Sequence, residues 1–169
     1  SYNIHKKLSP ARTTKILTAL IALKYGNLSD TVTISQNATT FPAGASLCHV
    51  REGDTITLEE LLYGLLLPSG NDAAVAIAEH ISGSVEEFAK LMNSEAYRIG
   101  ATNTHFVNPH GLHDDNHYTT AYDMAILFNY CLKNKTFEEI INTMQASVSP
   151  INNPDRVLVL ENSNYMLYG

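Results

Sequence analysis

Apolar residues recur at spacings of three and four along several stretches of the chain, which is the pattern of amphipathic α-helices. The clearest stretch is 10–25, which is followed by Gly26 as a stop signal. The alanine-rich stretch 71–81 ends before Gly83, and the stretch 120–133 has Asp123 near its start, where the helix dipole favours a negative charge. We therefore expect a helix in each of these three places.

Three further helix starts are marked by capping boxes, in which a Ser or Thr side chain and a Glu three residues later satisfy each other's free backbone amides. The predicted helices cover about 58–67, 85–99 and 137–144. Their boxes pair Thr57 with Glu60, Ser84 with Glu87, and Thr136 with Glu139.

Strands are few in this pattern. Residues 31–35 alternate between polar and apolar positions with β-branched side chains, which predicts a short half-buried strand, and residues 156–160 are a second candidate. Between residues 100 and 119 the chain is polar and contains Pro109 and Gly111, so we expect a long ordered loop there.

Composition limits the classes of function. The 169 residues, 44% of them hydrophobic, are enough for one domain with a real core. A net charge of -6 without a basic stripe disfavours nucleic-acid binding. No stretch has the length of a membrane span, and residues 1–7 lack the order of a signal peptide. Cys48 and Cys131 have no metal-ligand spacing and form no dense disulfide framework.

Candidate chemistry begins on the first helix. Positions 12 and 15 lie one turn apart on one face, which is suitable geometry for a nucleophile and its base. A lysine can remove a proton from a hydroxyl if burial or nearby cations keep the amine neutral, and Lys15 has the position for that role.

The second candidate element is Ser69-Gly70-Asn71 at the start of the predicted helix 71–81. Here Ser69 could pass on a proton and Asn71 could hold a substrate amide. Ser and Asn are also common helix caps, so a purely structural role remains the alternative.

Three blocks of sequence resemble the D-alanyl-D-alanine carboxypeptidases, the low-molecular-mass penicillin-binding proteins. They are the Ser-x-x-Lys-like helix at 9–19, the stretch 53–62 leading into Ser69–Ala74, and Phe106–Leu112 followed by Tyr118–Ala121. The blocks have the family's order, and the resemblance runs from about Leu8 to the C-terminus.

The resemblance implies the α+β fold of serine β-lactamases, which combines a helical lobe with an antiparallel sheet. We expect residues 1–169 to form a single partial domain of this kind, mainly the helical lobe with a few short strands. Most of the sheet would be missing, including the strands before the first motif and the family's Lys-Thr-Gly strand. Lys135-Thr136-Phe137 only imitates that third motif, because Thr136 is expected to cap a helix.

For function, the resemblance implies a serine enzyme that hydrolyses the D-Ala-D-Ala bond of peptidoglycan stem peptides through an acyl-enzyme, outside the cytoplasm. It also implies binding of β-lactams and requires no cofactor. The position of the nucleophilic serine, however, holds Arg12. A guanidinium stays protonated and offers only donors, and its charge should push Lys15 toward neutrality.

Two hypotheses of function follow. One is a D,D-carboxypeptidase impaired at Arg12; the other is a catalytically inactive protein that binds wall peptides or a partner chain, with Arg12 paired to a peptide carboxylate. Apolar surface intended for the sheet should also favour self-association or a complementing segment.

A metal site is the remaining alternative, because four histidines lie close together beside Asp114 and Asp115. Their spacing fits no known zinc pattern, and His110 lies within a block that resembles the family, so we expect no metal. The histidines are His105, His110, His113 and His117.

Overall fold

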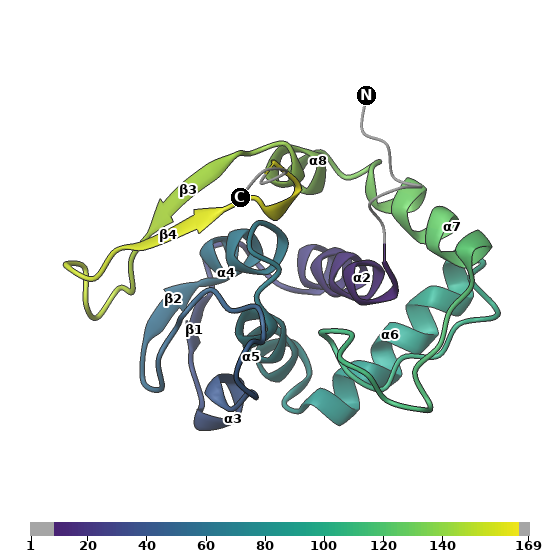
Figure 1. Cartoon of the computed structure of the whole chain (residues 1–169), viewed down its shortest axis with the longest axis horizontal. Helices are drawn as coiled ribbons and strands as arrows, with labels where there is room; N and C mark the ends of the chain where they lie inside the picture. Colours follow the sequence, from purple (N-terminus) through teal and green to yellow (C-terminus); the bar gives the residue numbers. More distant parts are fainter. Residues whose placement is uncertain (1–8, 166–169) are drawn as a thin grey trace.

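The computed structural model describes residues 9–165. It has a mixed α+β architecture in which helices surround one central helix and two small sheets lie at one side (Figure 1). The predicted fold class is confirmed. The helices are α2 (Pro10–Tyr25), α3 (Gln36–Thr39), α4 (Leu58–Leu66), α5 (Asn71–Ser82), α6 (Val85–Ile99), α7 (Ala121–Cys131), α8 (Lys135–Ile141) and the 3-10 turn η1 (Ser163–Tyr165).

The central helix is α2, and its bounds are those that the sequence predicts. The Ser9 side chain accepts a hydrogen bond from the amide of Arg12, and Pro10 occupies the first turn, where its missing N–H costs nothing. Every residue from Thr13 to Ala22 is buried, because α2 is covered by α4, α5, α6 and α7.

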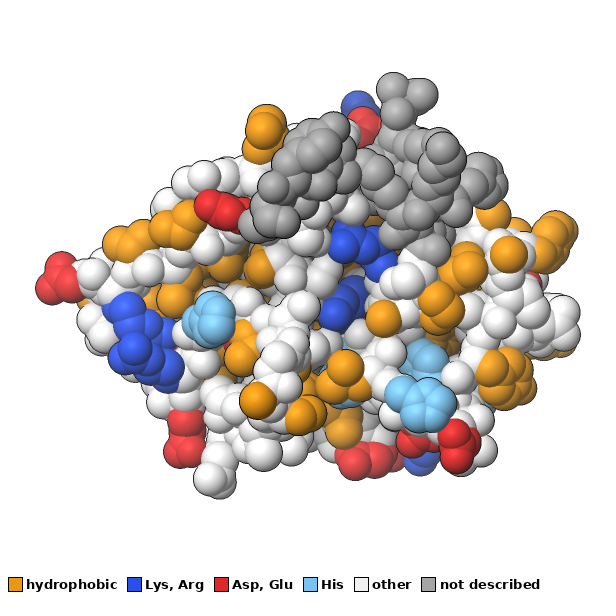
Figure 2. Space-filling view, in the orientation of Figure 1, with side chains coloured by type: hydrophobic (Ala, Val, Ile, Leu, Met, Phe, Trp, Pro, Cys, Tyr) orange, Lys and Arg blue, Asp and Glu red, His pale blue; other side chains and the backbone are white. Residues whose placement is uncertain are grey.

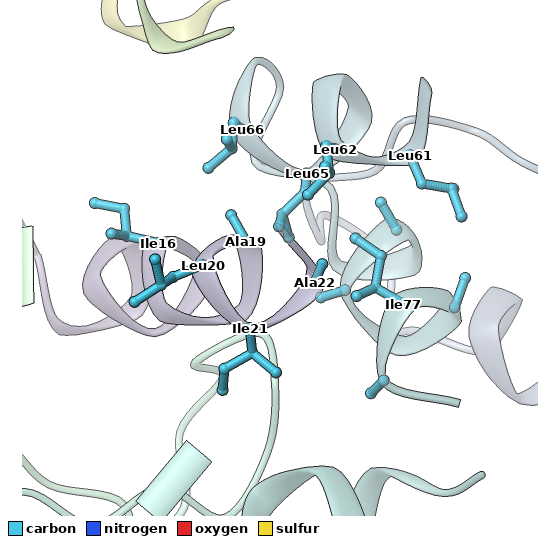
Figure 3. Close-up of a cluster of buried hydrophobic side chains, with 14 of the residues drawn as sticks. Ile16, Ala19, Leu20, Ile21, Ala22, Leu61, Leu62, Leu65, Leu66 and Ile77 are labelled. Atoms are coloured by element: carbon cyan, nitrogen blue, oxygen red, sulfur yellow. The ribbon is translucent and has the colours of Figure 1, made fainter. Parts of the chain in front are cut away.

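The core forms where α4 and α5 meet α2. Figure 3 shows Leu62 and Leu65 of α4 directed at Ala19 and Ala22 of α2, with Ile77 of α5 beside them. Small side chains on α2 let the helices approach closely, and the leucines fill the remaining space. This packing fixes the start of α2 relative to the α4–α5 turn.

The other helix starts follow the predicted caps with one exception. The capping box of Thr57 and Glu60 is complete, and Ser84 accepts from the amide of Glu87. The prediction of Thr136 as a cap is wrong. The side chain of Asn134 accepts from the amide of Phe137 instead, so α8 starts and ends earlier than predicted.

Each sheet consists of two antiparallel strands. In the first, β1 (Thr31–Thr33) pairs with β2 (Thr55–Thr57), placing Val32 opposite Ile56. In the second, β3 (Gln145–Val148) pairs with β4 (Leu158–Glu161). The sequence indicated β1 and, two residues too early, β4. It missed β2, β3 and α3.

The long loop 100–119 is ordered, as predicted, and it lies against the start of α2. A bridge between His105 and Tyr118 closes its base. Thr18 donates to the carbonyl of Pro109 at 2.7 Å, and Gly111 lies so close to Ala11 that an added Cβ would be 2.5 Å from the Cα of Ala11. The loop therefore supports the turn that holds positions 12 and 15.

Within residues 9–165, no helix is both long enough and apolar enough to cross a membrane.

Candidate active site

A small cavity brings together three of the four predicted site residues. Arg12, Lys15 and Ser69 share its lining with apolar side chains of α2, α4, α7 and α8, and it has room for about one water, about 20 Å³. Figure 2 shows Lys and Arg side chains at the centre of the face on which α2 begins. The fourth residue, Asn71, is buried at the first position of α5.

Lys15 lies almost completely buried, with 7% of its surface exposed. Burial, aided by the charge of Arg12 and opposed by the Asp72 carboxylate, lowers the pKa of Lys15 to about 8. No residue between 9 and 165 forms a hydrogen bond or an ion pair with its ammonium group. A lysine with this pKa can act as a base near neutral pH.

Arg12 occupies the position one turn before Lys15. Its guanidinium donates to the hydroxyl of Ser163 in η1 at 2.9 Å, a contact that spans 151 residues of sequence. One of five N–H donors is used there, so the remaining donors can bind a carboxylate.

No nearby hydroxyl replaces a nucleophile at position 12. The Thr13 hydroxyl donates to the carbonyl of Ser9 at 3.0 Å, and that of Thr14 donates to the carbonyl of Pro10 at 3.0 Å. The Ser9 oxygen accepts the amide of Arg12. These groups are used in holding the first turn of the helix.

Ser69 has a backbone conformation that is costly for a side chain other than Gly. Its φ of +60° lies in the left-handed region, where strain of about 1–3 kcal/mol is usual at functional turns. The turn is also crowded, since a Cβ on Gly70 would lie 2.7 Å from the carbonyl oxygen of Gly64. The strain directs Ser69 at the cavity instead of letting it cap α5.

Asn71 does not cap the helix either, because the N-cap of α5 is Gly70 and no side chain bonds there. The alternative reading of Ser69 and Asn71 as ordinary caps is thus wrong. The Oδ1 atom of Asn71 is buried and has no hydrogen-bond partner among residues 9–165. An unpaired buried acceptor of this kind costs about 1–3 kcal/mol, which a bound donor would recover.

Asp72 organises the turn from the other side. Its carboxylate accepts hydrogen bonds from the backbone amides of Cys48 and His49, each at 2.9 Å, and of Ala73. These bonds attach the loop at 48–50 to the start of α5. The role of Asp72 is therefore to hold this turn in place.

Two histidines of loop 100–119 face the start of α2. His117 accepts the amide of Val107 at Nδ1 and lies 2.9 Å from the Thr14 hydroxyl through Nε2; because that hydroxyl donates to Pro10, His117 is the donor. Burial lowers the pKa of His117. His110 accepts the amide of Leu112 at Nδ1.

Burial, together with the charges of Lys15 and His117, lowers the pKa of His110 to about 4. Both rings are consequently neutral at pH 7, with Nδ1 as an acceptor. They stabilise the loop only while neutral.

The four histidines do not converge on a metal. No group of three or more His, Cys, Asp or Glu side chains able to hold an ion occurs within 9–165. His105 stacks on Tyr118 and His113 pairs with Asp115. The carboxylate beside the loop, Asp123, instead accepts from Asn103 and Thr104.

Sequence reasoning missed Ser163 and the pairing of Thr14 with His117. Neither has a local signal, since the partners lie 151 and 103 residues apart. The arrangement can bind an anion beside Arg12, provide a base at Lys15 and offer an acceptor at Asn71. It has no hydroxyl at position 12.

Comparison with known proteins gives one family. A family model described as D-alanyl-D-alanine carboxypeptidase matches residues 1–169. The D-alanyl-D-alanine carboxypeptidase DacF of Bacillus subtilis is 40% identical over 170 residues, which cover 98% of this chain and 43% of that protein. DacC of Escherichia coli is 36% identical over 99% of this chain and 44% of its own length.

Solved structures of D,D-peptidases also match this chain. A mutant of the Streptomyces K15 DD-transpeptidase matches with a TM-score of 0.84 and 32% identity, covering 92% of this chain and 65% of that one. A D-alanyl-D-alanine carboxypeptidase of Mycobacterium tuberculosis matches with a TM-score of 0.79 and 32% identity, covering 89% and 56%. The chain spans somewhat less than half the length of the two curated relatives named above.

Proposed function

This chain belongs to the D-alanyl-D-alanine carboxypeptidase family, and from that premise we propose that it binds peptidoglycan stem peptides ending in D-Ala-D-Ala without cleaving them. The family consists of serine D,D-carboxypeptidases, so the ligand class follows from membership. The chemistry follows from position 12, where a guanidinium stands in place of a hydroxyl. Binding would take place outside the cytoplasm, where stem peptides are found.

The observation that carries this proposal is that Arg12 and Lys15 lie at one cavity and that no carboxylate among residues 9–165 forms an ion pair with either of them. Two cations in a partly dry site attract an anion. The terminal carboxylate of a peptide can accept two parallel hydrogen bonds from a guanidinium. Asn71 adds a buried acceptor that suits a peptide N–H.

Hydrolysis is disfavoured for a separate reason. An acyl-enzyme requires an ester bond between the enzyme and the penultimate D-Ala, and arginine has no oxygen with which to form it. The neighbouring hydroxyls of Thr13 and Thr14 donate to helix carbonyls. We therefore expect neither release of D-alanine nor a covalent adduct with a β-lactam.

Calorimetry tests the binding proposal. A tripeptide ending in D-Ala-D-Ala should bind, and the same peptide capped as a C-terminal amide should bind at least about tenfold more weakly, because it lacks the carboxylate that would pair with Arg12. The tripeptide ending in L-Ala-L-Ala should also bind more weakly if the ligand class of the family holds for this chain. Arg12→Gln should weaken binding by roughly ten- to a hundredfold. The matched control is Arg51→Gln, an exposed arginine outside the cavity. Equal affinity for the amide-capped peptide would contradict the proposed role of Arg12.

A second function, an active carboxypeptidase, has one observation in its favour. The pKa of Lys15, about 8, is suited to activating a hydroxyl. In this alternative another nucleophile would reach the substrate. Release of D-alanine by the purified chain, lost in Lys15→Met, would support it over the binding proposal.

Self-association stays a prediction. Four apolar side chains around the β3–β4 hairpin are more than half exposed, which favours contact with another surface. They are Met144, Ile151, Val157 and Val159. Sedimentation of the wild type and of Val157→Ser/Val159→Ser measures this. A monomer at all concentrations in both would contradict it.

A further inference from the structure

A second cationic site lies at the other end of α2, away from Arg12. It is a groove of about 420 Å³ between α2, α6 and α7, which we call the basic groove. Lys24, which lines this groove, lies nine residues after Lys15 on α2, a distance of about 13 Å along the helix axis. The lining residues are Leu20, Lys24, Arg98, Tyr130, Lys133 and Asn134.

The basic groove has an excess of positive charge. Three cations surround it, and Glu95, which is 3% exposed, pairs with two of them. Glu95 accepts from Lys24 at 2.9 Å and from Arg98 at 2.6 Å. Three positive charges against one negative charge leave a local excess of two in a chain of net charge -6.

Donors remain unused at the rim. Arg98 makes both of its bonds, to Glu95 and to the Tyr130 hydroxyl, through one terminal nitrogen, so its other two nitrogens have no partner among residues 9–165. Within the same range, no carboxylate pairs with Lys133, which lies 5.5 Å from the Tyr130 ring centre. Asn134 uses its oxygen to cap α8, which leaves its amide N–H groups available.

The interior of the basic groove is partly apolar. Leu20 is 6% exposed, and the Tyr130 ring is half-buried between Arg98 at 5.8 Å and Lys133 at 5.5 Å. Both cations are thus held near an aromatic face, where they are less hydrated than in open solvent. An aromatic or otherwise flat apolar group could cover Leu20 while its charge meets the cations.

We propose that the basic groove binds an organic anion, a carboxylate or phosphate carried on a flat apolar body. The volume suits a small molecule, and the lining has the usual composition of such sites, an apolar floor with a few convergent polar groups. Glu95 fixes two of the cations in advance, which reduces the ordering cost of binding. The basic groove shares no lining residue with the cavity at Arg12 and Lys15.

Phenyl phosphate and benzoate are suitable probes, with inorganic phosphate and phenol as their charge-only and ring-only counterparts. Binding is followed through the ring resonance of Tyr130, assigned by its absence in Tyr130→Phe. At least one of the two aromatic anions should bind about tenfold more tightly than either counterpart, and the tighter one identifies the anionic group. No shift with either anion, or equal binding of inorganic phosphate or phenol, would overturn the proposal.

Substitutions in and near the basic groove test whether the anion binds there. Lys133→Gln should weaken binding about tenfold, the effect of losing one charge-assisted contact, and it leaves the Glu95 ion pairs intact. Lys135→Gln removes the same charge from an exposed side chain two residues away and should change affinity by less than about twofold. Arg12→Gln should also have little effect. Equal losses in Lys133→Gln and Lys135→Gln would show only a diffuse attraction, contradicting a defined site.

Discussion

The two ends of α2 carry ionic side chains in opposite states. At the C-terminal end, Glu95 accepts hydrogen bonds from Lys24, Tyr25 and Arg98. At the N-terminal end, Lys15 is buried beside Arg12 and forms no ion pair with any carboxylate among residues 9–165, and the charge of Asp72 only partly offsets its burial. A satisfied cluster stabilises a helix, whereas an unsatisfied one costs stability and is kept where a ligand can use it. The difference supports the proposed peptide site at the N-terminal end, whereas at the other end Glu95 neutralises part of the charge and only the donors that it leaves unused could bind a ligand.

The pKa values of Glu95 and Lys15 show the same difference between the two ends of α2. Burial opposes ionisation of Glu95, yet the hydrogen bonds from Arg98, Lys24 and Tyr25 lower its pKa to about 2. This carboxylate therefore contributes stability above about pH 4.5, and the contribution is lost as the pH falls toward 2. Lys15 behaves differently, because its lowered pKa means that its charged form destabilises the folded state below about pH 8.

The largest predicted effect is at Gly111, which connects the loop to the N-terminal end of α2. Gly111→Ala should destabilise the protein by about 3 kcal/mol, because the φ of +83° is strained for alanine and the new Cβ meets the Ala11 backbone. Urea unfolding measures it. Gly100→Ala, with a φ of +111° and open space around it, is the control and should cost about 1 kcal/mol. Equal losses of stability in the two variants would show that the contact with Ala11 adds nothing to the effect of Gly111→Ala.

The second-largest effect is expected from removing Glu95, the carboxylate that accepts hydrogen bonds from Lys24, Tyr25 and Arg98. Glu95→Ala should lower the free energy of unfolding by about 2–3 kcal/mol, since three hydrogen bonds to a charged group disappear while the exposed cations regain water. Thermal unfolding measures this. Glu87→Ala removes an exposed pair with Lys90 and should cost under about 0.5 kcal/mol. A small effect at Glu95 would contradict its structural role.

Lys15→Met should raise the free energy of unfolding, in contrast to Glu95→Ala. It removes a buried cation, so we expect stabilisation of about 1–3 kcal/mol at pH 7, given a pKa of about 8 against an ordinary 10.5. Between pH 8 and 10.5 the unfolded wild type binds more protons, so its stability should rise with pH, and the variant should lack this rise. Lys90→Met, on the surface, is the control. Destabilisation by Lys15→Met would refute the contrast between the two ends.

The smallest effect concerns acid. His110 has its pKa lowered to about 4 in the folded state, so the unfolded chain binds more protons between pH 4 and 6.5 and stability should fall as the pH falls through that range. His110→Asn preserves an acceptor near Nδ1 and should reduce the loss between pH 7 and 4.5 by about 1–2 kcal/mol. Urea unfolding at both pH values tests this. His113→Asn, at an exposed position of the loop, should keep the wild-type dependence.

Local signals in the sequence were sufficient for much of this fold. Ser9, Pro10 and Gly26 delimit α2, and Thr57 with Glu60 starts α4, because capping depends on residues three apart. The same logic failed at Thr136, where Asn134 offered an equally good cap two residues earlier. The strand β3 was missed because Gln145–Val148 is only four residues long and contains a single β-branched side chain, Val148, although its polar and apolar residues alternate.

The candidate site was only partly accessible from sequence. Arg12, Lys15 and Ser69 stood out because they fall within motifs that resemble the family, and they line one cavity. The contact from Arg12 to Ser163 and the histidine bond to Thr14 depend on long-range folding, for which no local pattern exists. The orphaned oxygen of Asn71 is likewise visible only in three dimensions.

We propose that Arg12 leaves this family member without catalytic activity, and intact-mass measurement after incubation with penicillin tests that proposal most directly. Arg12→Ser restores a hydroxyl one turn before Lys15 and provides the matched comparison. We predict an unchanged mass for the wild type and a gain of one penicillin in Arg12→Ser, located at residue 12 by peptide mapping. A penicillin adduct on the wild type would contradict the proposed loss of activity, and an unchanged mass of Arg12→Ser would show that Arg12 is not its sole cause.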